Sequence, residues 1–213
     1  MKKFFSLLCA ISIIFAFSCF KGYSMEPVKS NKNLESDVIF SGTFWSSDKT
    51  EEEILCEFES RIEDQIDELG LSETTRMSEW YREDAEPQTY NFTAFPSGQP
   101  TNGYRFNSNY GGFVYTSSGG ATQTLSLSFG DPFGIVSLTV DMGTASPSEG
   151  SVGSIVFRDN LDPNGYYKLR VLKQYLVKPY IIYTREYEYA DWVAHHYKEV
   201  ELTNIEYFVT RVS

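Results

Sequence analysis

Between residues 51 and 69, apolar positions recur with the period of an α-helix. Ile54, Phe58 and Ile62 are spaced four residues apart, so they fall on one face of a helix. The positions between them carry mainly acidic and polar residues, which suit a solvated surface. The apolar stripe that this spacing predicts consists of Ile54, Leu55, Phe58, Ile62, Ile66 and Leu69.

Both ends of this segment carry signals of a helix terminus. Thr50 and Glu53 have the spacing of a capping box, in which each side chain bonds the backbone N–H of the other residue. Gly70 stands where a glycine commonly ends a helix. Between Glu51 and Glu68 there are nine acids and one base, Arg61, so the outer face of the predicted helix is a strongly negative ridge.

Farther along the chain, the apolar period shortens to two residues. Leu125–Phe129 and Val136–Met142 alternate apolar with small polar residues, as a strand with one buried face does. They flank Gly130–Gly134, whose Gly, Asp and Pro residues are typical of a loop. The sequence therefore predicts a β-hairpin with a five-residue loop.

Shorter apolar runs lie on both sides of this hairpin. The clusters within Val38–Trp45 suit an edge strand or packing beside the helix. Met77, Trp80 and Tyr81 indicate a second short helix that ends before Pro87. The further runs that indicate strands are Ser154–Arg158, Tyr166–Val177, Tyr180–Tyr189, Trp192–Tyr197 and Val200–Val212.

This order of elements, helices first and strands afterwards, predicts a mainly β (α+β) protein. We expect an antiparallel β-sandwich, with a barrel as the alternative, preceded by an N-terminal acidic amphipathic helix. The expected divisions are a secretory signal peptide (1–24), a tether with a short strand (25–47), a helical appendage (48–85), a loop-rich linker (86–112) and the β-sandwich domain (113–213).

The first 24 residues have the parts of a bacterial-style secretory signal. A Met-Lys-Lys start precedes an apolar run from Phe4 to Phe20, and Gly22–Ser24 supplies the small-residue pattern of a cleavage site. The sequence therefore predicts a secreted or cell-envelope-associated protein. A retained leader is one alternative, because the run approaches the length of a membrane span, and lipidation of Cys19 is another. Membrane contact is expected only in these two cases.

Charge and cysteine content narrow the expected partners. The chain has 18 Lys and Arg against 29 Asp and Glu, a net charge of −11. Nucleic acids and anionic lipid headgroups bind clustered positive charge, so neither is an expected partner.

Without the leader, Cys56 is the only cysteine, which excludes an intrachain disulfide and zinc sites built on cysteine pairs. No cofactor is expected.

Several motifs could carry chemistry, but each has a simpler interpretation. Cys56 lies on the helix away from the apolar stripe, and the glutamates beside it disfavour a thiolate, so we expect an exposed and sluggish thiol. His195 and His196 are adjacent on a predicted strand, so they point to opposite faces and cannot easily share a metal. Asn160–Gly165 resembles the first half of a calcium loop, yet Asp162–Gly165 is also a nearly ideal turn sequence. No catalytic residue or metal ligand is assigned.

The tyrosines near the C-terminus are the remaining signal. In an extended strand over Tyr180–Tyr189, the side chains of Tyr183, Arg185, Tyr187 and Tyr189 share one face. Tyrosine combines a large ring with a polar tip, which suits binding surfaces, although cross-strand packing uses the same residues. These four residues are the candidate ligand-binding residues, with Arg185 placed for an anionic or sugar ligand.

The function that these observations favour is non-enzymatic. We expect an exported β-rich protein that binds an unknown ligand at the envelope of a bacterial cell or outside it. A secreted hydrolase with an unrecognised carboxylate site is one alternative, and a toxin-like or immunity-like secreted factor is another. A deep cleft with converging carboxylates would favour the hydrolase, and a flat aromatic face would favour binding.

Overall fold

The structure is a computed structural model that describes residues 38–71, 79–107, 111–148, 155–157 and 161–212. The expected signal peptide and most of the expected tether lie outside the described residues, so export remains a prediction. Among the residues described, no helix is both long enough and apolar enough to span a membrane. Ser36–Ser213 forms one compact unit, in which the helix packs on the strands.

The predicted helix is present as α2 (Glu51–Glu68) and begins with the predicted capping box. The Thr50 hydroxyl accepts a hydrogen bond from the Glu53 N–H, and the Glu53 carboxylate accepts one from the Thr50 N–H at 2.8 Å. At the other end, Gly70 has a φ of 69°, the left-handed conformation expected of a glycine that follows a helix. Both helix ends therefore form as the sequence predicts.

Most of the predicted apolar stripe is buried. Leu55 is half-buried, and Leu69 is 43% exposed. Leu69 differs from the prediction because it is the C-cap residue and lies beyond the last turn that contacts the strands. The buried residues of the helix are Ile54, Phe58, Ile62 and Ile66.

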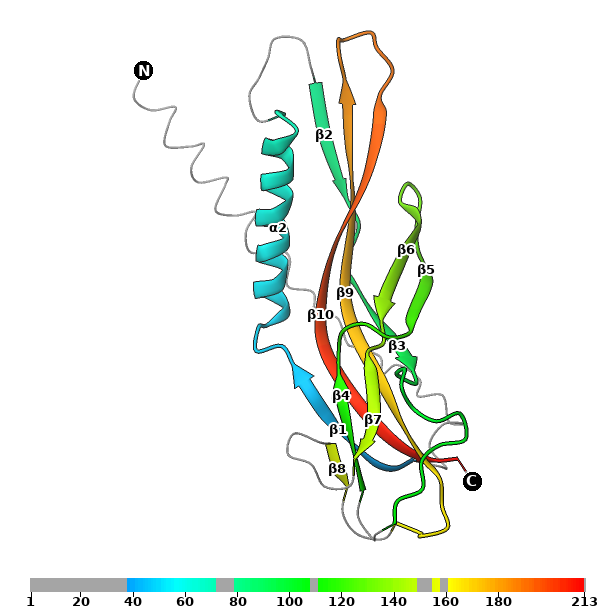
Figure 1. Ribbon diagram of the computed structural model, residues 1–213. Helices are drawn as coiled ribbons and strands as arrows, with labels where there is room; N and C mark the ends of the chain where they lie inside the picture. Colours follow the sequence, from blue (N-terminus) through cyan, green and yellow to red (C-terminus); the bar gives the residue numbers. More distant parts are fainter. Residues whose placement is uncertain (1–37, 72–78, 108–110, 149–154, 158–160, 213) are drawn as a thin grey trace, which may run out of the picture. The chain divides into compact units, whose positions relative to one another are not determined.

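The centre of the fold is a hairpin of two long strands, β9 (Tyr167–Arg185) and β10 (Val193–Arg211). β1 (Val38–Ser46) pairs with the outer edge of β10, while β2 (Glu79–Asp84) and β3 (Gln88–Ala94) pair with successive parts of β9 (Figure 1). Every pairing in this sheet is antiparallel, which confirms the mainly β, antiparallel prediction. Among the described strands the barrel alternative is wrong, because the order β1-β10-β9-β2 leaves β1 and β2 as open edges.

Both long strands are continuous where the sequence predicted breaks. Pro179, which separated Tyr166–Val177 from Tyr180–Tyr189 in the prediction, lies inside β9, and β10 is likewise unbroken. The Pro179 carbonyl accepts the Ala85 N–H, so the proline nitrogen faces the same side, at the gap between β2 and β3. Because no ladder bond is required there, the missing N–H of proline does not interrupt the strand.

The predicted second short helix is wrong. Trp80 and Tyr81 lie in β2, opposite Thr184 and Tyr183 of β9, whereas Met77 lies outside the described residues. A short helix is marginal by itself, and pairing with the edge of β9 satisfies the same backbone groups in an extended conformation. The segment 86–112, expected to hold loops and short strands or to be a linker, contains β3 and the first residues of a further strand.

A second layer of strands packs on one face of the long hairpin. β4 (Gly111–Thr116) pairs on one side with β7 (Thr144–Ser148) and on the other with β8 (Ile155–Phe157). β5 (Thr122–Gly130) and β6 (Gly134–Asp141) form the predicted hairpin, which ends at the predicted loop. The alternation of apolar and polar residues in these two segments thus corresponds to paired strands with one buried face.

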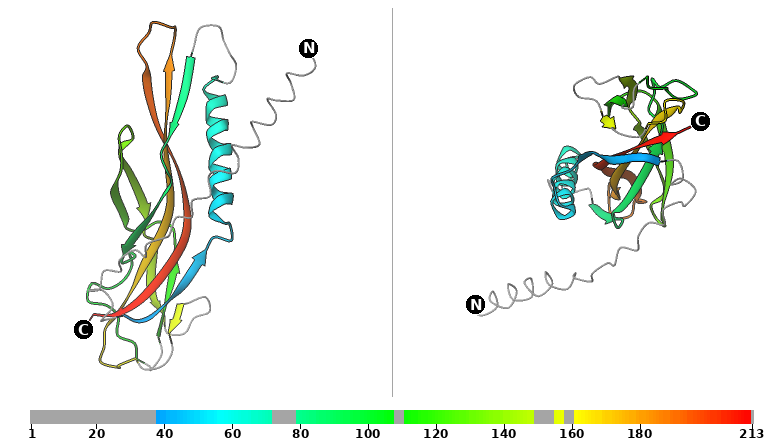
Figure 2. Two further views of the ribbon diagram at one scale, coloured as in Figure 1. Left: turned by 180° about the vertical axis from the view of Figure 1, so that it is seen from behind. Right: turned by 90° about the horizontal axis from the view of Figure 1, so that it is seen from below.

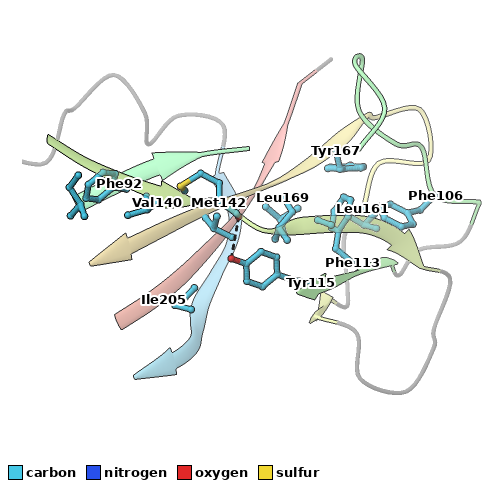
Figure 3. Close-up of a cluster of buried hydrophobic side chains, with 14 of the residues drawn as sticks. Phe92, Phe106, Phe113, Tyr115, Val140, Met142, Leu161, Tyr167, Leu169 and Ile205 are labelled. Carbon is cyan, nitrogen blue, oxygen red and sulfur yellow. Dashed lines mark hydrogen bonds between the residues drawn. The ribbon is translucent and has the colours of Figure 1, made fainter. Parts of the chain in front are cut away.

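The main core lies between this second layer and the central sheet. Leu169 and Val171 of β9 pack with Phe113 of β4 and Val140 of β6 in one buried cluster (Figure 3). The Tyr115 hydroxyl donates to the Met142 carbonyl at 3.3 Å, so this buried polar group is satisfied. Apolar side chains from both layers therefore supply most of the buried surface.

Alternate residues of β9 face α2 on the opposite side of the sheet. Leu176 packs with Ile54 and Phe58, and farther along Tyr180 and Ile182 pack with the end of the helix. The views in Figures 1 and 2 agree that α2 runs beside β9 and β10. The helix predicted as an appendage thus covers one face of the sheet.

Ion pairs fasten the helix along this interface. Glu59 of α2 pairs with Lys178 of β9 and with Arg82 of β2, the latter at 2.8 Å. Arg61 pairs with Glu199 of β10 at 2.6 Å. Burial alone would raise the pKa of Glu59, but the hydrogen bonds from Lys178 and Arg82 hold that pKa below its usual value. The charged form of Glu59 is therefore part of the folded structure.

Candidate binding site at the end of the β9–β10 hairpin

The end of α2, the start of β2 and the turn between β9 and β10 lie at the same end of the unit (Figure 1). Tyr187 is 60% exposed and Tyr189 is 87% exposed in this turn. Contiguous exposed apolar patches are common at sites of interaction, so this end is a candidate binding surface. The members of this set, here called the aromatic end, are Trp80, Tyr81, Tyr187, Tyr189 and Trp192.

Part of the aromatic end is held by ring contacts. The rings of Tyr81 and Tyr183 stack with centroids 4.6 Å apart and an interplanar angle of 11°. Trp192 presents an edge to Tyr81 at 4.8 Å. Because these rings come from β2, β9 and the turn before β10, the contacts fix the turn against two strands.

Arg185 ties the same group together. Its guanidinium lies 4.5 Å from the centroid of the Trp192 ring. Its Nε donates to the Glu79 carboxylate at 2.9 Å, and its Nη1 donates to the Glu188 carbonyl at 2.8 Å. Arg185 therefore connects the turn to β2 through these contacts, and Glu79 compensates its positive charge.

The structure separates the four candidate residues into two pairs. Tyr183 and Arg185 make the packing contacts above, which is the simpler interpretation that the sequence left open. Tyr187 and Tyr189 do not continue the strand, because β9 ends at Arg185 and the chain turns, with the Ala190 N–H bonded to the Tyr187 carbonyl at 2.9 Å. Their exposure leaves both rings available to a ligand.

A groove of about 590 Å³ opens beside the turn. Leu69 and Leu71, after α2, line it together with Val193 of β10, which is 53% exposed. Tyr187 belongs to both the groove and the aromatic end. A concave, mostly apolar surface with a few polar groups is the usual form of a binding site.

Polar groups also line this groove. Glu186 and Asp191 contribute carboxylates from the turn, and His195 contributes its ring from β10. The His195 Nε2 lies 3.1 Å from the Thr184 hydroxyl, so this histidine has a partner within the protein. Arg185 lines the groove as well, but its guanidinium is paired with Glu79.

The sequence missed several members of this site. Trp192 and Tyr81 lie outside the predicted strand Tyr180–Tyr189, and the sequence predicts a helix at Tyr81. Leu69 and Leu71 were counted with the helix stripe or left unassigned. The position of Trp192 next to a turn is a sequence signal that could have included it in the site. Tyr81 has no such signal, because it reaches the site only through the pairing of β2 with β9.

The other sequence motifs lie in ordinary structural surroundings. Cys56 is a free, exposed thiol on α2, as expected. The Asp162 carboxylate accepts the Asn164 N–H at 2.9 Å and pairs with Arg211, and the Gly165 N–H bonds the Asp162 carbonyl. The turn interpretation of this motif is confirmed. The hydrogen bond from Asn164 and the charge of Arg211 hold the pKa of Asp162 below its usual value.

A second hollow of about 420 Å³ contains the amine of Lys173. This lysine is 3% exposed, and its Nζ donates to the carbonyls of Ser117 and Asp141. Burial lowers the pKa of Lys173, against the influence of Asp141. Both bonds hold connections of the second layer to β9, so Lys173 has a structural role.

The end of the β9–β10 hairpin thus joins exposed rings and an apolar groove on supported strands. Preorganised support of this kind lowers the entropic cost of binding. No protein-family model, curated protein sequence or solved structure is detectably similar to this chain.

Proposed function

We propose that this chain is an exported, non-enzymatic binding protein that contacts its ligand with the aromatic end and the adjoining groove. The observation that carries the proposal is the exposure of Tyr187 and Tyr189 on a turn that Arg185 and Trp192 hold in place. Exposed tyrosines on a fixed support lose little entropy on binding, which makes them effective contact residues.

The β-rich body supports this role as a scaffold. We infer that the central sheet and the second layer form a β-sandwich, with α2 covering the outer face of the sheet. Loops at the end of such a scaffold commonly carry binding residues, because the strands fix their positions. The N-terminal leader pattern supports an extracellular or envelope ligand.

A fluorescently labelled form of the purified protein tests this proposal against intact cells and envelope fractions of its host. We expect saturable binding that falls at least about tenfold in the double variant Tyr187→Ala/Tyr189→Ala. The matched control is Trp45→Ala/Phe95→Ala, which removes two exposed rings outside the aromatic end. Equal binding by both double variants would show that the aromatic end is not the contact surface.

A hydrolase is the second candidate, because Glu186 and Asp191 line the same groove. Hydrolases of glycosidic bonds use two carboxylates that flank the scissile bond. Incubation with polysaccharide and glycopeptide substrates tests this candidate. Turnover that Glu186→Gln and Asp191→Asn each abolish would favour the hydrolase over the binding protein.

A further inference from the structure

The groove beside the β9–β10 turn is lined by both apolar and acidic residues. Leu69, Leu71 and Val193 supply the apolar surface. Glu186 and Asp191 supply two carboxylates, and both residues are exposed. Among the residues that the structure describes, no Lys or Arg forms an ion pair with either carboxylate, so neither negative charge is offset by a described basic side chain.

The adjoining end of α2 adds to this negative charge. The carbonyl end of a helix carries a partial negative charge, which basic side chains in the last turn normally offset. The last turn of α2 contains no basic residue, and it contains Asp67 and Glu68. The chain then continues directly into Leu69, which lines the groove.

Arg185, which lines the groove, and Arg61 of α2 are already engaged in ion pairs. The Arg185 guanidinium pairs with Glu79 and lies against Trp192. The Arg61 side chain pairs with Glu199 and Glu201, away from the groove lining. A positively charged ligand is therefore attracted, while an anionic ligand meets the two free carboxylates and a chain of net charge −11.

We propose that this groove binds a cationic amphipathic peptide segment, with its apolar side chains on Leu69, Leu71 and Val193 and its Lys or Arg side chains toward Glu186 and Asp191. This inference rests on the proposed binding function and names the class of partner. Apolar contact supplies affinity, while complementary charge supplies orientation and a faster association. A peptide that is only apolar or only cationic makes one of these two kinds of contact and should bind more weakly.

Isothermal titration of the purified protein with a short alternating Leu-Lys peptide tests the proposal. Two matched probes are a Leu-Glu peptide, with the same apolar side chains, and a Ser-Lys peptide, with the same charge. We expect the Leu-Lys peptide to bind at least about tenfold more tightly than either. Failure of the Leu-Lys peptide to bind, or equal binding of the Leu-Glu peptide, would overturn the proposal.

Charge-neutral variants locate the binding site. Glu186→Gln/Asp191→Asn should weaken binding of the Leu-Lys peptide about tenfold and reduce its dependence on salt. Asp48→Asn/Glu52→Gln removes the same two charges at the opposite end of α2 and should leave the affinity unchanged. Equal weakening by both double variants would assign the binding to the overall negative charge and overturn the groove proposal.

Two single variants separate this inference from the proposed binding function on which it rests. Tyr189 belongs to the aromatic end and does not line the groove, so Tyr189→Ala should weaken binding to envelope fractions more than it weakens binding of the Leu-Lys peptide. Val193→Ser should weaken peptide binding and leave the unfolding transition unchanged, since Val193 is exposed. Loss of envelope binding with peptide binding unaffected thus reports on the aromatic end alone.

Discussion

The Arg185 guanidinium lies 4.5 Å from the centroid of the Trp192 ring while its Nε donates to Glu79 at 2.9 Å. Trp192 precedes β10, Arg185 ends β9 and Glu79 begins β2, so one side chain connects all the elements that form the hairpin end. The turn that bears Tyr187 and Tyr189 is attached at both of its ends to this group. The exposed tyrosines are therefore carried on a supported turn.

Removal of Arg185 should destabilise the protein. Arg185→Ala deletes a cation–π contact and an ion pair with Glu79, so the free energy of unfolding should fall by about 1–2 kcal/mol. Denaturant unfolding measures the change. Lys49→Ala, which deletes the exposed pair with Glu57, is the control and should have no measurable effect. Equal stability of both variants would show that Arg185 does not support the turn.

The helix stripe makes a second prediction. Phe58 is fully buried against Leu176, so Phe58→Ala should lower the free energy of unfolding by about 3–5 kcal/mol. Glu63 is exposed on the outer face, so Glu63→Ala should change it by no more than about 0.5 kcal/mol. Chemical denaturation of both variants decides the matter. Small effects at both positions would mean that α2 does not pack on the sheet.

Alkaline pH should weaken the fold through two buried tyrosines. Burial raises the pKa of Tyr115 and that of Tyr180 from 10.0 to about 12. Because the folded state favours the neutral phenols, their contribution is complete below pH 10 and is lost as the pH rises from 10 to about 12. Tyr180→Phe should reduce the decrease in the free energy of unfolding over this pH range, as measured by denaturant unfolding. An unchanged alkaline slope would contradict the assignment.

Acid should weaken the attachment of α2. The hydrogen bonds from Lys178 and Arg82 hold the pKa of Glu59 below 4.5, so its contribution is present above that pH and is lost as the pH falls. Glu59→Gln should lower stability at neutral pH and reduce the loss below pH 4.5. Glu63→Gln, a substitution of an exposed acid on the same helix, should leave the acid profile intact. A profile of Glu59→Gln that matches the unmodified protein would contradict this account.

Local patterns in the sequence predicted the elements that carry their own signals. The capping box at Thr50, four of the six predicted stripe positions of α2 and the β5–β6 hairpin each depend on residues close in sequence, and each is confirmed. The negative ridge of α2 was also visible from its composition. These features required no knowledge of the tertiary structure.

Features that depend on distant partners could not be predicted in this way. Trp80 and Tyr81 form a strand because β9 offers an open edge, and Pro179 fits inside β9 because β2 and β3 leave a gap opposite it. The same long-range pairing brings Tyr81 to Tyr183. It also places Glu79 beside Arg185, so this candidate ligand residue makes an ion pair within the protein.

The groove could not be predicted from the sequence, because it also depends on residues that are distant along the chain. Leu69 and Leu71 follow the helix, whereas Val193 begins β10 more than a hundred residues later. Their meeting depends on how α2 lies against the central hairpin. Of the four candidate ligand residues, Arg185 and Tyr187 line the groove.

Oxidative footprinting of the protein, free and bound to envelope fractions of its host, tests the central claim most directly. The proposal predicts that binding protects Tyr187, Tyr189 and Trp192 from oxidation, while the exposed rings of Trp45 and Phe95 remain as reactive as in the free protein. Protection of Trp45 and Phe95 with continued oxidation of Tyr187 and Tyr189 would contradict it, because the ligand would then lie away from the end of the β9–β10 hairpin.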